Sequence, residues 1–263
     1  MKKSGNVPLL PFCVFLPLGV FLLCVVMFCG LCVTPVSAQE RSPGDAAATS
    51  YAPIEVLNAQ IQATVAELAE KMNAGEAYWD ENAAEVRRLA NVLAVFAQVA
   101  GLHDQYCPAK NGATNIIDAG KVLAKVSTYA EAQAAWTQMQ EALASTDSKN
   151  LAWSDPAGSF REVMQSIALY DQEISERIKK RRGLDKVAGR AVAMAVLFQG
   201  MTAMAHESPK PENAVMWQEF CMRCRDASYF LHVTLEVSDR KYSPKNYEIL
   251  HKHCAECHQE FGN

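Results

Sequence analysis

Two cysteines and a histidine stand together near the end of the chain, at Cys254, Cys257 and His258. On a helix these positions are i, i+3 and i+4, so the three side chains share one face. Two thiols with this spacing can form thioether bonds to the two vinyl groups of a haem, while the imidazole of the following histidine reaches the iron. The pattern therefore predicts one covalently bound haem c, with Cys254 and Cys257 forming the thioethers and His258 as the proximal iron ligand.

A second pair, Cys221 and Cys224, leaves other uses of these thiols open. Four thiolates could close a tetrahedral zinc site, although the gap between the two pairs exceeds the usual zinc-ribbon spacing. A disulfide within the C-terminal pair is the third interpretation, and it would not use the histidine. Arg225 stands where a haem-binding histidine would follow Cys224, so we expect the second pair to form a local disulfide or to be reduced core thiols.

The first 38 residues have the order of a secretory signal peptide. Two lysines precede an apolar run at residues 8–33, and the small residues Val36, Ser37 and Ala38 come before a polar segment. This order predicts export, with cleavage after Ala38. The apolar run is also long enough to span a bilayer as an uncleaved membrane anchor. Either interpretation places the rest of the chain outside the cytoplasm, in the periplasm, where thiols tend to oxidise.

The composition of the remaining chain argues against two broad functions. Removing residues 1–38 leaves 225 residues (263 − 38) with a formal charge of −6 (23 − 29). No basic stripe could neutralise phosphates, so a nucleic-acid partner is not expected. The sequence also has no Ser-His-acid arrangement, phosphate-binding loop or paired carboxylates at a recognisable site. We therefore do not expect an enzyme.

The chain after residue 52 has the pattern of helices joined by loops. Residues 39–52 carry few large apolar groups and are expected to form a flexible leader. Beyond them the sequence is rich in alanine, has apolar residues at helical spacing and lacks strand-like alternation, which predicts an all-α fold. The predicted helices are residues 53–73, 81–105, 115–125, 129–145, 155–182, 184–206, 211–236 and 244–261. The last four make a unit at residues 156–261 with the cysteine motif on its final helix, and residues 53–150 make an N-terminal region without that motif.

A weak internal similarity links the two regions. The segment RRLANVLAVFAQVAGLHD at residues 87–104 aligns with GRAVAMAVLFQGMTAMAHE at residues 189–207, which places Arg87 over Arg190. A tryptophan-centred helix follows each segment. Residues 53–150 are therefore a candidate degenerate repeat of the C-terminal unit, although alanine-rich helices can also look alike through composition alone.

At residues 157–261 the chain resembles cytochrome c-prime and its relatives, the class II c-type cytochromes. The resemblance rests on FREVMQSIALY in the first helix of the unit, VMWQEF in the third, and CAECHQEF in the last, where an aromatic residue stands three positions after the histidine. It implies an up-down four-helix bundle with one covalent haem, periplasmic single-electron transfer or binding of small gases such as nitric oxide, and often a homodimer. The chain departs from the family at Gly262, where a basic residue is usual, and in its N-terminal extension.

The opposite face of the iron needs a separate prediction. No methionine follows His258, which excludes the common c-type class with a methionine ligand downstream. Some of the resembling proteins leave the distal face open and others fill it with a methionine of the first helix, so Met164 is the candidate distal ligand. Its alternative role is a core methionine. His251, seven residues before His258, lies on nearly the same helical face and could approach the haem edge.

The sequence thus predicts an exported monohaem c-type cytochrome that transfers single electrons to or from an unidentified redox partner protein. Two alternatives remain open. One is a haem protein that binds small gases such as nitric oxide or carbon monoxide, and the other is a zinc-stabilised helical interaction protein without haem.

Overall fold

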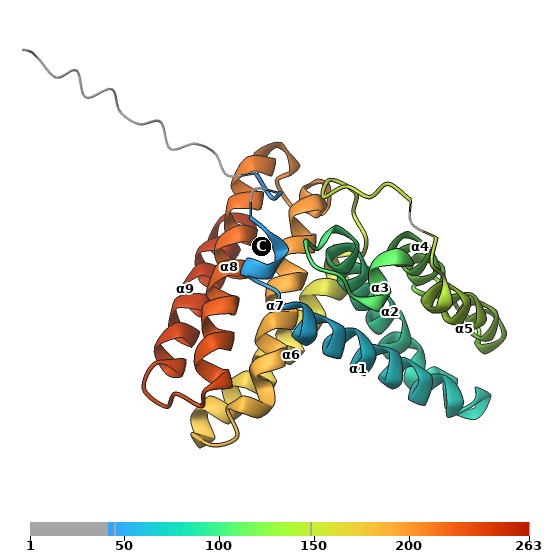
Figure 1. The fold of residues 1–263 in the computed structure, drawn as a ribbon, viewed down its shortest axis with the longest axis horizontal. Coiled ribbons are helices and arrows are strands. Elements are labelled where there is room, and N and C mark those ends of the chain that lie inside the picture. Colours follow the sequence, from blue (N-terminus) through green and yellow to red (C-terminus); the bar gives the residue numbers. More distant parts are fainter. Residues whose placement is uncertain (1–41, 45, 148, 263) are drawn as a thin grey trace, which may run out of the picture. The chain divides into compact units, whose positions relative to one another are not determined.

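The structure is a computed structural model that describes residues 42–262, except residues 45 and 148. The predicted signal peptide at residues 1–38 lies outside the described residues. Every regular element in the described part of the chain is a helix, as the sequence predicts, and no strand occurs there. Nine α-helices are joined by loops and by five short 3-10 helices in these residues (Figure 1).

The α-helices form an N-terminal and a C-terminal group along the sequence. The first group consists of α1 (Ile54–Asn73), α2 (Trp79–Leu102), α3 (Pro108–Asn111), α4 (Ala113–Leu123) and α5 (Tyr129–Ala144). The second group consists of α6 (Phe160–Lys180), α7 (Ala188–Met201), α8 (Ala214–Glu236) and α9 (Ser243–Phe261). Each predicted helix has a counterpart here. The main differences are that α6 begins at Phe160 and not near residue 155, and that both ends of α7 continue as 3-10 helices, at Asp185–Val187 and Thr202–Glu207.

Local sequence signals account for where α5 begins and α6 ends. The Thr128 hydroxyl accepts a hydrogen bond from the Glu131 backbone N–H, while the Glu131 carboxylate accepts one from the Thr128 backbone N–H. This capping box satisfies two donors that would otherwise lack partners. Helix α6 ends before Arg181, which adopts the left-handed conformation with a φ of 50°. Such a residue stops a helix, and the basic run before it suits the negative end of the helix dipole.

Helices α2 and α7 form the centre of the described core. Every residue of α7 except Gly189 and Arg190 is buried, and α2 packs against both α7 and α6. Gly200 allows the two central helices to approach closely, because a Cβ atom at that position would collide with the Val95 side chain. The two regions predicted from the sequence therefore share one core.

The burial of α7 also explains its apolar sequence. The stretch Asp185–Glu207 is long and apolar enough to cross a membrane, with a mean hydropathy of 1.4, yet 83% of its most apolar window is buried inside the protein. A core helix of a globular protein meets the same criteria. This stretch is therefore only a weak indication of a membrane span.

The two helix groups repeat one order of packing. In the N-terminal group α1 packs on α2, α2 on α4 and α4 on α5, and in the C-terminal group α6 packs on α7, α7 on α8 and α8 on α9. This order matches the alignment of α2 with α7, but the two tryptophan-centred helices occupy different places in it, since Trp136 lies on the fourth helix, α5, and Trp217 on the third, α8. His103 and His206, which the same alignment places over each other, also differ, because His103 is buried and hydrogen-bonded to the carbonyl of Ala52, whereas His206 is exposed.

The segment expected to be a flexible leader is packed at its C-terminal end. Tyr51 and Ala52 are fully buried, and the guanidinium of Arg225 lies 4.7 Å from the centre of the Tyr51 ring. The side-chain amide of Gln199 donates a hydrogen bond of 3.0 Å to the carbonyl of Pro43. This packing depends on few apolar residues, because the segment covers the buried Arg225 with the Tyr51 ring and accepts a hydrogen bond from Gln199.

Candidate functional site

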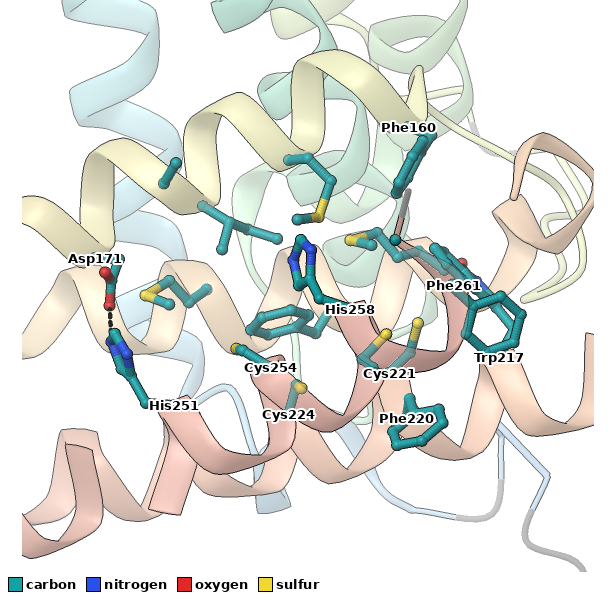
Figure 2. A pocket seen from close by; sticks show the side chains of 18 of the residues that line it. Phe160, Asp171, Trp217, Phe220, Cys221, Cys224, His251, Cys254, His258 and Phe261 are labelled. Atoms are coloured by element: carbon teal, nitrogen blue, oxygen red, sulfur yellow. Dashed lines mark hydrogen bonds and ion pairs between the residues drawn. The ribbon is translucent and has the colours of Figure 1, made fainter. Parts of the chain in front are cut away.

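An apolar cavity of about 430 Å³ lies among the four helices of the C-terminal group (Figure 2). All of α6, α7, α8 and α9 contribute side chains to its walls. The volume falls within the range of roughly 300–1,000 Å³ that is typical of ligand and cofactor pockets. Helices α6 and α9 thus lie on two sides of a space large enough for a cofactor.

Helix α9 brings the three residues of the cysteine motif to this cavity. Cys254, Cys257 and His258 all line it, as expected for positions i, i+3 and i+4 of one helix. The two thiols are half-buried, whereas the histidine is more exposed. Figure 2 shows the imidazole of His258 pointing from α9 toward α6. Its ring nitrogens have no hydrogen bond to any of the described residues, so the imidazole is available to a ligand in the cavity.

Apart from the carboxylate of Asp171, the wall formed by α6 and α7 carries carbon and thioether groups. Met164 of α6 lines the cavity and is partly buried. Three residues of α7 also line the cavity: Met194, Phe198 and Met201. The structure thus brings Met164 to the same cavity as His258, as the predicted role of distal ligand requires. The same surroundings also suit a core methionine, because a thioether fills irregular apolar space.

The second cysteine pair lies on the wall formed by α8. Cys221 and Cys224 are buried, line the cavity and are free thiols, so they do not form the local disulfide that was one of the expectations. Figure 2 shows Cys224 next to Cys254 on α9. The hydrogen bond between these two thiols raises the pKa of Cys224 and lowers the pKa of Cys254.

The other two cavity thiols, Cys221 and Cys257, have pKa values above that of an ordinary cysteine because they are buried. Burial raises the pKa of Cys221 well above its usual range and raises that of Cys257 to about 11. Within residues 42–262, apart from 45 and 148, no group of three or more His, Cys, Asp or Glu side chains is arranged to hold a metal ion. The four thiols therefore lie near one another without forming a tetrahedral site. Cys107 is buried elsewhere, at the start of α3.

One end of the cavity is closed by aromatic rings. The Trp217 ring meets Phe160 and Phe261 edge-on, each at 5.3 Å between ring centres, and its indole N–H donates a hydrogen bond of 2.7 Å to the carbonyl of Met201. These contacts fix a large apolar surface against the cavity. Phe160, Trp217 and Phe261 all stand in the segments that carry the family resemblance, but none of these rings was predicted from the sequence to be part of the site.

A polar pair lies at another part of the cavity wall. The imidazole of His251 lies 2.8 Å from a carboxylate oxygen of Asp171 (Figure 2). The Tyr247 ring packs on the His251 ring, with 4.2 Å between the ring centres. Burial raises the pKa of Tyr247 to about 12. The structure therefore brings His251 to the cavity edge, as its helical position predicted. The neighbouring His253 does not line the cavity and lies 3.4 Å from Glu256 on the same helix.

These residues fit the chemistry of a covalent haem. The donor set is two thiols and one unbonded imidazole on a single helix face, and the cavity before it is apolar and enclosed by aromatic rings at one end. The described residues thus define an all-helical protein with a cavity lined by cysteine, histidine and methionine. Comparison of the chain with protein-family models, with curated proteins and with solved structures finds no match.

Proposed function

We propose that this chain is an exported monohaem c-type cytochrome that transfers single electrons. The observation that carries the proposal is the position of Cys254, Cys257 and His258 together on the α9 wall of an apolar, four-helix cavity. In this proposal α6 to α9 form a haem-binding four-helix bundle with the attachment motif on its last helix. The order of packing along α6, α7, α8 and α9 supports that arrangement. So does the sequence resemblance to cytochrome c-prime.

Each residue has a definite role in this proposal. Cys254 and Cys257 would hold the haem through thioether bonds, and the free imidazole of His258 would bind its iron as the proximal ligand. The haem, when bound, supplies a centre that takes up and gives back one electron. The rings of Phe160, Trp217 and Phe261 keep water from one end of the cavity. Burial of the haem in these apolar surroundings would raise the cost of the added charge on the oxidised iron and so tune the potential.

Gas binding is a second candidate function for the same haem. Around Met164 the surfaces of α6 and α7 that face the cavity present the apolar side chains of Ile167 and Phe198, and the carboxylate of Asp171 on α6 is paired with His251. If the Met164 sulfur did not bind the iron, these apolar side chains would leave room for a small neutral gas to do so. A ferrous absorption spectrum that shifts on adding carbon monoxide would favour gas binding. A spectrum that does not respond would favour Met164 as the sixth ligand and electron transfer as the function.

The remaining parts of the proposal come from the sequence alone. We propose export to the periplasm because of the signal-like segment at residues 1–38, with membrane attachment if that segment is kept. The partners would be an unidentified redox protein and, by resemblance, a second copy of the chain in a homodimer. A zinc-stabilised protein is less well supported, because the described thiols do not form a metal-binding group.

The proposal can be tested by expressing the full chain in a bacterium with c-type haem maturation and recording a pyridine haemochrome spectrum. The wild-type protein and the variant C221S/C224S should both give the spectrum of a haem attached through two thioethers. The variant C254S/C257S should lose covalent haem. This control is closely matched, because both variants remove two thiols from the same cavity. Equal haem content in both variants, or none in the wild type, would reject the proposed attachment site.

A further inference from the structure

Four thiols line the cavity, but one haem uses only two. Cys221 and Cys224 come from the middle of α8, and Cys254 and Cys257 come from the last turns of α9. Only residues 237–242 separate the two helices, so they run antiparallel and pack along each other. The proposed function therefore leaves the α8 pair without a role, although both of its thiols are buried against the attachment site.

Thiols of α8 and α9 lie next to each other. Cys224 and Cys254 are in hydrogen-bond contact, and Figure 2 shows their side chains next to each other between α8 and α9. Cys221 and Cys257 are near enough for their charges to interact. Each thiol of α8 is thus matched by one of α9. Cys224 and Cys254, which share a hydrogen bond, are therefore the pair that we expect to be joined most readily.

Helix geometry disfavours the alternative bonds within each Cys-x-x-Cys pair. Residues three apart on a helix have Cβ atoms about 5–6 Å apart, whereas a disulfide holds its Cβ atoms at about 3.5–4.5 Å. A bond between Cys221 and Cys224, or between Cys254 and Cys257, would therefore require a turn of α8 or α9 to distort. A bond between the helices leaves both helices intact.

We propose that Cys224 and Cys254 form an interhelical disulfide in the haem-free protein, by exchange with an organic disulfide of the glutathione type. The half-buried Cys254 is the more accessible of the two thiols and reacts first. Its thiolate displaces one thiol from the small disulfide and gives a mixed disulfide. The Cys224 sulfur then attacks the Cys254 sulfur and releases the second thiol. Two protein thiols become one disulfide, and the small disulfide is reduced to two thiols.

The consequence for haem attachment rests on the proposed function. A Cys254 sulfur bonded to Cys224 cannot form a thioether, so the disulfide and the covalent haem exclude each other. In a compartment that oxidises thiols, the haem-free chain would be held in a form that must be reduced by a dithiol before attachment. The α8 pair would thus make haem attachment dependent on the local thiol reductant.

The disulfide itself can be mapped without haem. The full chain, produced without haem maturation, is incubated with oxidised glutathione, alkylated, and digested with trypsin and a glutamate-specific protease under non-reducing conditions. Arg223 separates Cys221 from Cys224, and Glu256 separates Cys254 from Cys257, so each of the four cavity cysteines falls in a different peptide. The expected product is a cross-link between the Cys224 and Cys254 peptides. It should disappear in C224S and persist in C107S and C221S.

Other products would overturn the inference. Bonds within either Cys-x-x-Cys pair, or glutathione adducts without a cross-link, would show that the contact between Cys224 and Cys254 does not direct oxidation. The result is also separable from the haem proposal. A Cys224–Cys254 cross-link in a protein that never acquires covalent haem would reject the proposed function and leave the disulfide in place. Covalent haem in a protein that never forms the cross-link would support the proposed function and reject the disulfide.

Discussion

His258 lies on the cavity wall with an imidazole that no described residue binds, so its replacement should affect a bound iron more than the fold. We expect H258G to keep the thioether-bound haem but to show an altered absorption spectrum, and added imidazole should restore the spectrum by occupying the vacated position. The matched control is H253G, because His253 lies on the same helix and does not line the cavity. A spectrum that changes equally in both variants would contradict the role of His258 as ligand.

The buried side chain of Arg225 contacts both the N-terminal segment and the core. Its guanidinium donates a hydrogen bond of 2.6 Å to the side-chain oxygen of Gln199, pairs with Asp226 at 2.7 Å, and lies over the Tyr51 ring. We expect R225A to lower the free energy of unfolding by about 1–3 kcal/mol, because the buried Gln199 oxygen would lose its donor.

The control for this prediction is R223A, measured in the same urea unfolding experiment. Arg223 stands two residues away on α8 and pairs with Glu219 at 3.2 Å, but both side chains are substantially exposed. Exposed pairs of this kind contribute only about 0–1 kcal/mol. Similar losses in the two variants would show that burial of Arg225 is not the cause.

At the scale of helices, the crossing of α2 and α7 at Gly200 is open to a direct test. Alanine is favoured over glycine inside a helix by about 1 kcal/mol, whereas overpacking a core costs about 1–3 kcal/mol. A Cβ atom at Gly200 would collide with Val95, so we expect G200A to be destabilising. In the V95A background the collision is relieved, and the same substitution should become neutral or stabilising. A loss of stability that is unchanged by V95A, measured by thermal unfolding, would contradict this packing.

The helices were predictable from the sequence because their signals are local. Proline, glycine and polar clusters mark the loops, and the apolar spacing of each segment identifies its helix, so the boundaries of α5 and α9 agree closely with the prediction. The position of Cys254, Cys257 and His258 on one helix face followed from their spacing in the same way.

The parts that could not be predicted depend on contacts between distant residues. The contact of Cys224 with Cys254 depends on how α8 lies along α9, and the aromatic end of the cavity joins Phe160 to rings that follow it by more than fifty residues. No short stretch of the sequence predicts either of these two contacts. The same is true of Tyr51, whose burial depends on an arginine of α8.

For the whole molecule, the N-terminal region is part of the core that supports the site. Helix α7 lines the cavity with one face and packs on α2 with another, so removing residues 53–150 would expose a broad apolar surface of α7. We expect a fragment of residues 156–263 to lose cooperative thermal unfolding, followed by circular dichroism, while the full chain keeps it. A fragment that unfolds at the same temperature as the full chain would show that the C-terminal helices form an independent domain.

The most direct test of the proposed function is the mass of the C-terminal peptide. Protein produced with c-type haem maturation is digested with trypsin, which cleaves after Lys252 and releases HCAECHQEFGN. The proposed function predicts that this peptide carries one haem bound through both Cys254 and Cys257, with no thiol left to alkylate. A peptide that instead takes up two alkyl groups and lacks haem would contradict it.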